Sequence, residues 1–259
     1  MIFADTHTHL YAEEFAADRD QVVQKAFDNG VKYLFLPNID RQYYQGMMDL
    51  CLRHPGHCFP MIGLHPTSVK SDYQDELNFI IEKLSQDEQR FYAIGEVGID
   101  LYWDKTYADE QADALNIHLD LALKYCLPVV IHTRNSFDEV IHILEEKQNP
   151  ALSGVFHCFG GSVGQAKQAI SLGFFLGIGG IITYKNSGLQ KVLEEVDLEN
   201  LVLETDAPWL TPVPFRGQRN ESSFIPFIAG KIAEIKKLPV EEVARITTEN
   251  ALKLFNIKG

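Results

Sequence analysis

The feature that most constrains the fold of this chain is a regular alternation of short apolar runs with segments of helical periodicity. Eight runs rich in Val, Ile, Leu and Phe start roughly 20 to 36 residues apart, which is the spacing of strand–helix units in a parallel sheet. Each run is followed by a polar or Gly-rich break. The runs predict strands at residues 2–7, 31–38, 58–65, 91–98, 127–133, 154–159, 174–180 and 201–206.

The segments between the runs carry apolar stripes and helix-ending residues. Helices are predicted at 18–29, 75–84 and 108–125, where apolar side chains recur at helical spacing. Ser162 is expected to cap a further helix. Because no Pro- or Ser-rich linker divides the 259 residues, we expect a single (β/α)8 TIM-like barrel over residues 1–259, with its site at the carboxyl ends of the strands. The short sixth unit keeps a doubly wound open sheet as the alternative.

Composition bears on compartment and partners. Asp and Glu outnumber Lys and Arg by 36 to 23, which gives a formal net charge of −13, whereas a protein that coats long nucleic acid needs a basic face. The chain shows no apolar stretch of membrane-spanning length, no basic leader sequence and no CxxC pair among its four cysteines. We therefore expect a reduced, cytoplasmic protein with no membrane segment and no evident protein partner.

Side chains that bind metals or transfer protons recur at the predicted carboxyl ends of the strands. In a barrel these ends meet at one rim, so side chains that are far apart in the sequence are expected to lie together there. The residues at these positions are His7, His9, Asn38, His65, Glu96, His132, His157 and Asp206.

The first and fourth strands carry the clearest ligand pattern. In an extended strand, the two-residue spacing of His7 and His9 points both imidazoles to one face, an arrangement common at Zn²⁺, Mn²⁺ or Fe²⁺ sites. Taken alone, the pair would also be explained as two surface or core histidines. Glu96 lies in an apolar strand, where an unpaired carboxylate is costly. It is therefore expected to bridge two cations, although a bond to a buried Arg or Tyr would also explain it.

The later strands complete the predicted centre. His132 and His157 each follow apolar residues, and either one alone would be explained as a packed core histidine. Together with Glu96 they form a second ligand set, while Cys158 is expected on the opposite face as a packing residue. Asp206 ends an apolar run, and we expect it to bind one cation and to accept the proton of an attacking water.

Residues in the rim loops are weaker candidates. Arg134 and Arg219 could contact a phosphate, although surface salt bridges explain them equally well. Tyr102, Trp103 and Trp209 could stack on nucleobases, although loop aromatics more often pack the loop itself.

These residues and their surroundings resemble the TatD family of metal-dependent deoxyribonucleases within the amidohydrolase superfamily, and the resemblance runs the length of the chain. No Lys stands in the fourth-strand motif, so Glu96 would take the place of the carboxylated lysine that bridges the metals of many amidohydrolases. Ser222 and Ser223 stand where many relatives have a Pro. The matching motifs are DTHTHL (5–10), GLHP (63–66), GEVGID (95–100), LPVVIHTR (127–134), FHCFGG (156–161), ETDAPWLTP (204–212), RGQRNE (216–221) and TTENALKLF (247–255).

The resemblance implies metal-assisted phosphodiester hydrolysis with two divalent cations per chain. Zn²⁺, Mn²⁺ and Mg²⁺ all remain open, although a His-rich site favours the first two. Water would attack phosphorus in line, and Asp206 would accept its proton. The first cation would be held by His7, His9, Glu96 and Asp206, the second by Glu96, His132 and His157, and the phosphate pocket would be lined by His65, Arg134 and Glu204.

The substrate implied by the resemblance and by the charge is a DNA end or a short single-stranded oligonucleotide. One alternative is an amidohydrolase-type enzyme that uses the same metals on a lactone, a cyclic amide or another small ester. A second alternative is a barrel that binds a metal or a nucleotide without catalysis, which the presence of Asp206 as a proton acceptor disfavours.

Overall fold

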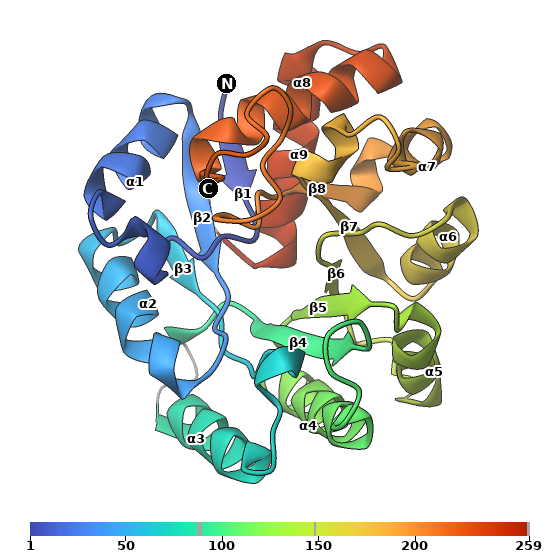
Figure 1. Cartoon of the computed structure of the whole chain (residues 1–259). Helices are drawn as coiled ribbons and strands as arrows, with labels where there is room; N and C mark the ends of the chain where they lie inside the picture. The colour runs from blue at the N-terminus through green and yellow to red at the C-terminus, as the bar shows by residue number, and fades with distance from the viewer. Residues whose placement is uncertain (87–89, 148, 258–259) are drawn as a thin grey trace.

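In the computed structural model, which describes residues 1–86, 90–147 and 149–257, parallel strands form a closed barrel inside a ring of helices (Figure 1). The expected (β/α)8 barrel is therefore confirmed, and the doubly wound open sheet is excluded. Within the described residues the strands are β1 (Phe3–Asp5), β2 (Val31–Leu36), β3 (Cys58–Pro60), β4 (Ile94–Asp100), β5 (Val129–Arg134), β6 (Gly154–Phe156), β7 (Phe174–Ile178) and β8 (Leu201–Leu203).

The barrel consists of two arcs that close at two seams. Strands β1–β2–β3 form one arc, and β4–β5–β6–β7–β8 form the other, with parallel neighbours throughout. At one seam Thr8 pairs with Ala207 just beyond β1 and β8, and at the other Ile62 pairs with Ile94. Each seam therefore lies beside residues that the sequence assigns to the metal centre.

The helices surround the barrel in chain order, as the colour gradient of Figure 1 shows. Within the described ranges, no helix is both long enough and apolar enough to cross a bilayer. The helices are α1 (Arg19–Asp28), α2 (Arg41–Arg53), α3 (Tyr73–Gln86), α4 (Ala108–Tyr125), α5 (Phe137–Lys147), α6 (Val163–Ser171), α7 (Leu189–Glu195), α8 (Ile225–Lys236) and α9 (Val240–Leu254).

Apolar side chains pack in two layers, one inside the barrel and one between the barrel and the helices. The inner layer takes buried side chains from successive strands, including Phe35, Val130, Val155 and Val202. Phe255, just after α9, stacks on Phe35 with ring centroids 4.1 Å apart. Phe255 thus packs into one end of the barrel, and the polar candidate residues lie at the other end.

Helix α6 begins as the sequence predicts. The Ser162 side chain accepts a hydrogen bond from the Gln165 N–H at 3.3 Å, and the Gln165 side chain accepts one from the Ser162 N–H at 2.9 Å. This reciprocal pair is a capping box, which satisfies two N–H groups at the helix start.

Most strands end earlier than predicted, so most candidate ligands lie just beyond them. Pairing stops at Asp5 in β1 and at Leu203 in β8. Cys158 and Asp206 have φ angles of 47° and 56°, in the left-handed region that a strand cannot continue through. The exceptions are β4, which extends to Asp100, beyond the predicted end at residue 98, and β5, which extends to Arg134, one residue beyond the predicted end at 133.

Candidate metal centre

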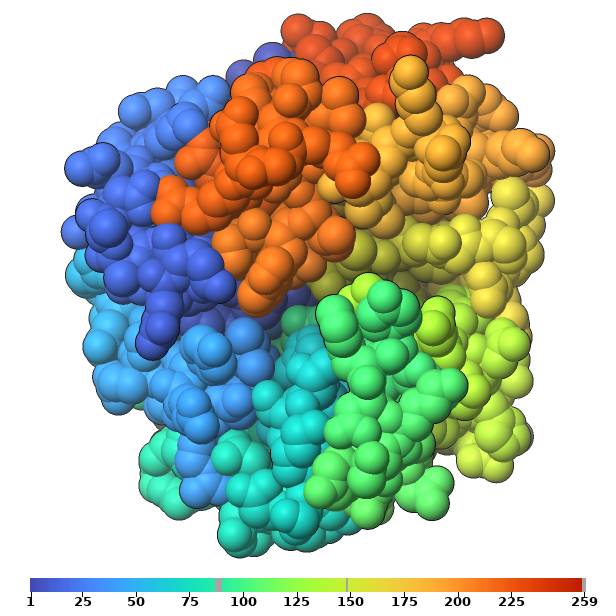
Figure 2. Space-filling view, in the orientation of Figure 1, coloured from blue at the N-terminus to red at the C-terminus, as the bar shows by residue number. Residues whose placement is uncertain are grey.

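The carboxyl ends of the strands open onto a cleft of about 590 Å³. In Figure 2 the loop after β4 (green) and the segment after β8 (orange) border a hollow near the centre of this face. Among the predicted site residues, His7 and Glu204 are buried beneath the cleft, with 0% and 1% of their surface exposed. The predicted site residues that line the cleft are His9, His65, Glu96, His132, Arg134, His157 and Asp206.

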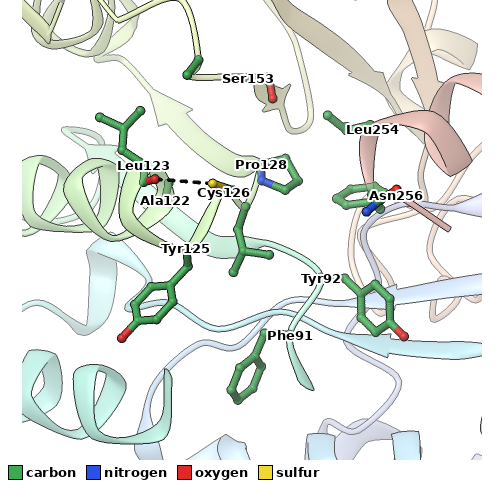
Figure 3. A pocket seen from close by; sticks show the side chains of 13 residues that line it. Phe91, Tyr92, Ala122, Leu123, Tyr125, Cys126, Pro128, Ser153, Leu254 and Asn256 are labelled. Atoms are coloured by element: carbon green, nitrogen blue, oxygen red, sulfur yellow. Dashed lines mark hydrogen bonds between the residues drawn. The ribbon is translucent and has the colours of Figure 1, made fainter. Parts of the chain in front are cut away.

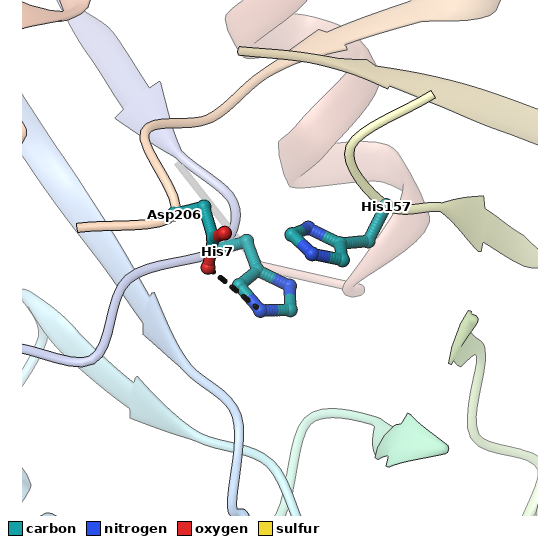
Figure 4. A group of neighbouring side chains, drawn as sticks. All are labelled: His7, His157 and Asp206. Carbon is teal, nitrogen blue, oxygen red and sulfur yellow. Dashed lines mark ion pairs between the residues drawn. The ribbon is translucent and has the colours of Figure 1, made fainter. Parts of the chain in front are cut away.

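A first cluster of ligand atoms forms where β1, β4 and β8 meet. His7 Nε2 lies 3.2 Å from His9 Nε2 and 3.0 Å from Glu96 Oε2. Asp206 Oδ1 lies 3.6 Å from His9 Nε2 and 3.9 Å from His7 Nε2. Figure 4 shows Asp206 directed toward a ring nitrogen of His7, and the His7 ring is stacked on the His157 ring with centroids 3.5 Å apart.

The His7–His9 and His7–Glu96 separations, 3.2 and 3.0 Å, fit one divalent cation, and the Asp206 oxygen lies slightly farther out, at 3.6 and 3.9 Å. Ligands at about 2.1 Å from a common cation lie roughly 3.0 to 3.4 Å apart in octahedral or tetrahedral geometry. Two ring nitrogens at 3.2 Å need either a proton or a cation between them, because two lone pairs would otherwise face each other. The mixed nitrogen and oxygen donor set suits Zn²⁺ or Mn²⁺.

The ligands of the first cluster are oriented by residues that the sequence analysis did not identify. His9 Nδ1 lies 2.6 Å from the Tyr11 hydroxyl, which itself donates to a backbone carbonyl. His9 must therefore donate from Nδ1, which leaves the Nε2 lone pair facing the cluster. The buried Asp5 carboxylate accepts hydrogen bonds from the His7 N–H at 3.3 Å and the Thr205 N–H at 2.9 Å, so it joins the ends of β1 and β8.

Glu96 turns its second carboxylate oxygen toward another group of histidines. Glu96 Oε1 lies 2.8 Å from His132 Nδ1, 3.4 Å from His65 Nε2 and 3.6 Å from His157 Nε2. Glu96 thus stands between two clusters, as a bridging carboxylate would. His65 comes as close to Glu96 as His157 does, although the sequence placed His65 in the phosphate pocket.

Asp100 orients His132 and was missed by the sequence analysis. Asp100 Oδ2 lies 3.0 Å from His132 Nε2, so His132 is held between two carboxylates. Burial lowers the pKa of His132, but the hydrogen bonds to Asp100 and Glu96 outweigh burial and raise it to about 9. A carboxylate behind a ligating imidazole fixes its tautomer and strengthens it as a ligand. The GEVGID motif, which ends at Asp100, could have signalled this residue.

Glu204 lies behind His157 and not among the described residues that line the cleft. Its Oε1 is 3.0 Å from His157 Nδ1 and accepts the Cys158 N–H at 2.6 Å. Gly177 makes room for it, because a Cβ there would lie 2.2 Å from Glu204 Oε2. The Cys158 sulfur lies within 4.8 Å of ligand atoms of His157 and Glu204. The expectation that Cys158 points to the opposite face is therefore wrong.

The electrostatics of the first cluster favour a cation. Burial lowers the pKa of His7, and burial together with His7 lowers the pKa of His9 well below its usual value, so both imidazoles are neutral ligands. Burial opposes charge on Glu96, but the facing histidines hold its pKa well below the usual range. Burial and the charge of Glu96 raise the pKa of Asp206 well above its usual value. The first cluster therefore lacks positive charge, which a bound cation would supply.

Two other candidates have structural partners. The Arg219 guanidinium binds the Asp18 carboxylate through two nitrogens at 2.9 and 2.6 Å, and it lies 4.4 Å over the Phe15 ring. Arg219 therefore holds the segment after β8 against the start of α1. Asn38 is buried and donates to the Gly63 carbonyl at 3.1 Å.

His118 on α4 is a packed histidine that supports the loop before His65. Its Nδ1 donates to the Ala114 carbonyl at 2.7 Å, and its Nε2 accepts the Leu64 N–H at 3.3 Å. Burial lowers the pKa of His118 to about 4. The ring is therefore neutral in the folded protein at physiological pH.

A cavity of about 500 Å³ lies at the other end of the barrel, near the amino end of β5 (Figure 3). Its lining includes Tyr92, Cys126 and Asn256, and the Cys126 sulfur contacts the Leu123 carbonyl at 3.9 Å. None of the candidate His, Asp or Glu ligands lies in this lining. The chemistry therefore belongs to the cleft above the strands.

A barrel with such clusters at its carboxyl rim defines a metal-dependent hydrolase of the amidohydrolase type. The family model for TatD related DNases matches residues 4–256 of the chain. The chain therefore belongs to the TatD family of metal-dependent hydrolases, as the sequence motifs predict.

Individual relatives agree with this assignment over their full length. The chain is 38% identical over 258 residues to the uncharacterized metal-dependent hydrolase YabD of Bacillus subtilis, covering 99% of this chain and 100% of YabD. It is 32% identical to the 3'-5' ssDNA/RNA exonuclease TatD of Erwinia tasmaniensis, covering 98% and 99%. The crystal structure of YjjV, a TatD homologue from Escherichia coli K12, superposes with a TM-score of 0.92 at 30% identity, covering 99% of this chain and 98% of YjjV.

Proposed function

We propose that this protein is a two-cation phosphodiesterase that shortens single-stranded DNA from an end. The observation that carries the proposal is the position of Glu96, whose Oε2 lies 3.0 Å from His7 and whose Oε1 lies 2.8 Å from His132. One carboxylate between two ligand groups is the arrangement that a two-metal hydrolase needs.

Each residue of the cleft has a proposed role in binding a cation, binding the phosphate or positioning a ligand. When bound, the two cations would supply Lewis-acid activation of water and neutralise charge on the phosphate. His65 and Arg134 line the same cleft and bind the phosphate oxygens. Glu204 positions His157 from below. The first cation would be held by His7, His9, Glu96 and Asp206, and the second by Glu96, His132 and His157.

Asp206 serves as the proton acceptor for the attacking water. It lines the cleft, and its side chain keeps 14% of its surface exposed, whereas that of Glu96 keeps 2%. Asp206 is thus the carboxylate of the first cluster that water can reach. A cation bound beside Asp206 would favour the ionised carboxylate, which is the form that can accept a proton.

The choice of substrate rests on charge and on a relative. Among the described residues that line the cleft, Arg134 is the only Lys or Arg, and the whole chain carries a net charge of −13. Such a surface can neutralise few phosphates, so it suits a short strand or an end better than a long duplex. A relative at 32% identity is named as a 3'-5' ssDNA/RNA exonuclease.

The test uses the purified protein with Mn²⁺ or Zn²⁺. A short single-stranded oligonucleotide should shorten progressively from one end, while closed circular DNA of the same concentration stays intact. A strong chelator should stop the reaction, and added metal should restore it. Hydrolysis of a lactone or cyclic amide panel with no cleavage of the oligonucleotide would instead support the small-ester alternative.

A further inference from the structure

Two tryptophans stand exposed at the mouth of the cleft. Trp103, in the loop after β4, is 67% exposed, and Trp209, in the segment after β8, is 45% exposed. Both line the cleft together with the candidate ligands, and the segments that carry them border the hollow in Figure 2. Large apolar rings left in water at the mouth of a functional cleft indicate a flat apolar ligand group.

Trp103 is fixed to the metal centre through Asp100. The backbone N–H of Trp103 donates to Asp100 Oδ1 at 3.1 Å, and the other carboxylate oxygen of Asp100, Oδ2, contacts His132. The ring of Tyr102 meets Trp103 edge to face, with centroids 5.0 Å apart. The Arg134 guanidinium lies 3.9 Å from the Tyr102 ring centroid and 5.1 Å from that of Trp103. The result is an aromatic corner that also carries a positive charge.

Trp209 is fixed to the other cluster. Its ring contacts the ring of His9 in a T-shaped arrangement, with centroids 5.2 Å apart. The backbone N–H of Trp209 donates to the Asp206 carbonyl at 2.8 Å. Each tryptophan is thus tied to one of the two ligand clusters, and its remaining surface is free for a ligand.

The side chains of the cleft supply little positive charge for phosphates other than the one at the proposed cations. Arg134 is the one Lys or Arg in the described lining, which also contains the carboxylates of Asp40, Glu96, Asp100 and Asp206. Stacking on aromatic rings binds any nucleobase, but only a base whose faces are not already stacked in a duplex.

We propose that Trp103 and Trp209 stack on nucleobases on either side of the phosphodiester to be cleaved, and so select unpaired strand ends. This inference rests on the proposed phosphodiesterase function and adds the part of the substrate that is recognised. Specificity for a single strand then comes from base stacking at the mouth of the cleft, and not from a basic track.

The experiment compares an octathymidylate with an octamer that has the same phosphates but abasic sites at its two terminal positions at each end. Because stacking contributes about 1 to 3 kcal/mol per base, Trp103→Ala and Trp209→Ala should each raise KM for the octathymidylate about 5- to 100-fold. The value of kcat should change less than about threefold, because uniform binding is lost. Neither variant should change KM for the abasic octamer, and the salt dependence of KM should stay as in the parent.

A second readout does not depend on turnover. The chain contains two tryptophans, so intrinsic fluorescence reports directly on the mouth of the cleft. In the metal-loaded Asp206→Asn variant, the octathymidylate should quench this fluorescence and the abasic octamer should not. Phe227→Ala, which truncates a 45% exposed aromatic residue on α8, is the matched control and should behave as the parent. Metal content is measured for every variant, because Trp209 contacts His9.

The outcomes separate this inference from the proposed function. If the parent cleaves both octamers with equal KM and the octathymidylate causes no quenching, the stacking role is overturned while the phosphodiesterase function stands. Equal loss on both octamers in Trp103→Ala, which touches no predicted ligand, would assign that residue a structural role and also overturn the inference. If the parent cleaves neither octamer, the proposed function itself is contradicted.

Discussion

Replacing Asp100 by asparagine should weaken one of the two proposed cation positions and spare the other. In the parent, Asp100 Oδ2 accepts from His132 Nε2 at 3.0 Å, while Oδ1 accepts the N–H groups of Tyr102 and Trp103. In the variant, the amide oxygen can keep the two backbone bonds, which leaves the amide NH₂ facing His132 Nε2. The amide NH₂ and the protonated Nε2 of His132 are then two hydrogen-bond donors facing each other. Because residue 100 is only 1% exposed, water cannot separate them, and we expect the His132 proton to move from Nε2 to Nδ1.

That shift changes the atom that faces Glu96. His132 Nδ1 lies 2.8 Å from Glu96 Oε1, and a protonated Nδ1 has no lone pair for a cation. Removing a carboxylate behind a ligating histidine costs about 10- to 100-fold in metal affinity, which is about 1.4 to 2.7 kcal/mol. The first cluster, around His7 and His9, should keep its affinity because Asp100 does not contact it.

The measurement is a titration of metal-free protein with Zn²⁺ in competition with a chromophoric chelator. The parent should show two equivalents, and Asp100→Asn should show one unchanged and one weakened by 10- to 100-fold. Asp104→Asn removes the same charge four residues away, where the carboxylate is exposed and paired with Lys70, and should match the parent. Two unchanged affinities in Asp100→Asn would refute the reasoning, and nitrogen NMR of the imidazole would show directly whether the tautomer changed.

Three further changes test other parts of the structure. Asp206→Asn should lower the rate of phosphodiester hydrolysis roughly 100-fold or more with the fold intact, the range for losing a general base; a rate within about threefold of the parent at equal metal content would remove Asp206 from proton transfer. Glu96→Ala should lower the content of both cations, measured by elemental analysis, and a loss of one cation alone would contradict the bridge. His118 has a folded pKa of about 4 against an ordinary 6.5. As pH falls from 6.5 towards 4, His118 takes up a proton in the unfolded chain but not in the folded chain, and this residue alone lowers the unfolding free energy of the metal-free protein by up to about 1.4 kcal/mol per pH unit. His118→Gln should reduce this slope in urea unfolding at pH 6.5 and 5.5, and an unchanged slope would argue against a neutral buried ring.

The gathering of the candidate ligand histidines at one rim was predictable, because they stand at or just after the ends of apolar runs. His132 and His157 follow Val-Val-Ile and Val-Phe, and a barrel brings such positions to one rim whatever their distance along the chain. The barrel itself followed from the same periodicity. The predicted ends of the strands were less accurate, because the backbone leaves the hydrogen-bonded sheet early and places polar side chains at the rim.

The supporting residues were harder to predict because their partners are not encoded locally. Asp5 contacts Thr205, and Asp100 contacts His132, across 200 and 32 positions of the chain. The rule that successive side chains of a strand point to opposite faces also fails where φ is positive, and Cys158 and Asp206 both have positive φ angles. That failure explains why Cys158 turns toward Glu204 and not to the opposite face.

The two seams of the barrel couple cation binding to the opening of the fold. The backbone bonds His9 N–H to the Ala207 carbonyl, at 2.8 Å, and Asp206 N–H to the His7 carbonyl, at 2.9 Å, cross one seam, and they join the very segments that hold the first cluster. A cation shared by these segments and by Glu96 would also span the second seam. A ligand at 100 times its dissociation constant stabilises the state that binds it by about 2.7 kcal/mol. The amide protons of His9 and Asp206 should therefore exchange with solvent about 100-fold more slowly when the centre is saturated, so a bound cation would hold the barrel closed as well as take part in hydrolysis.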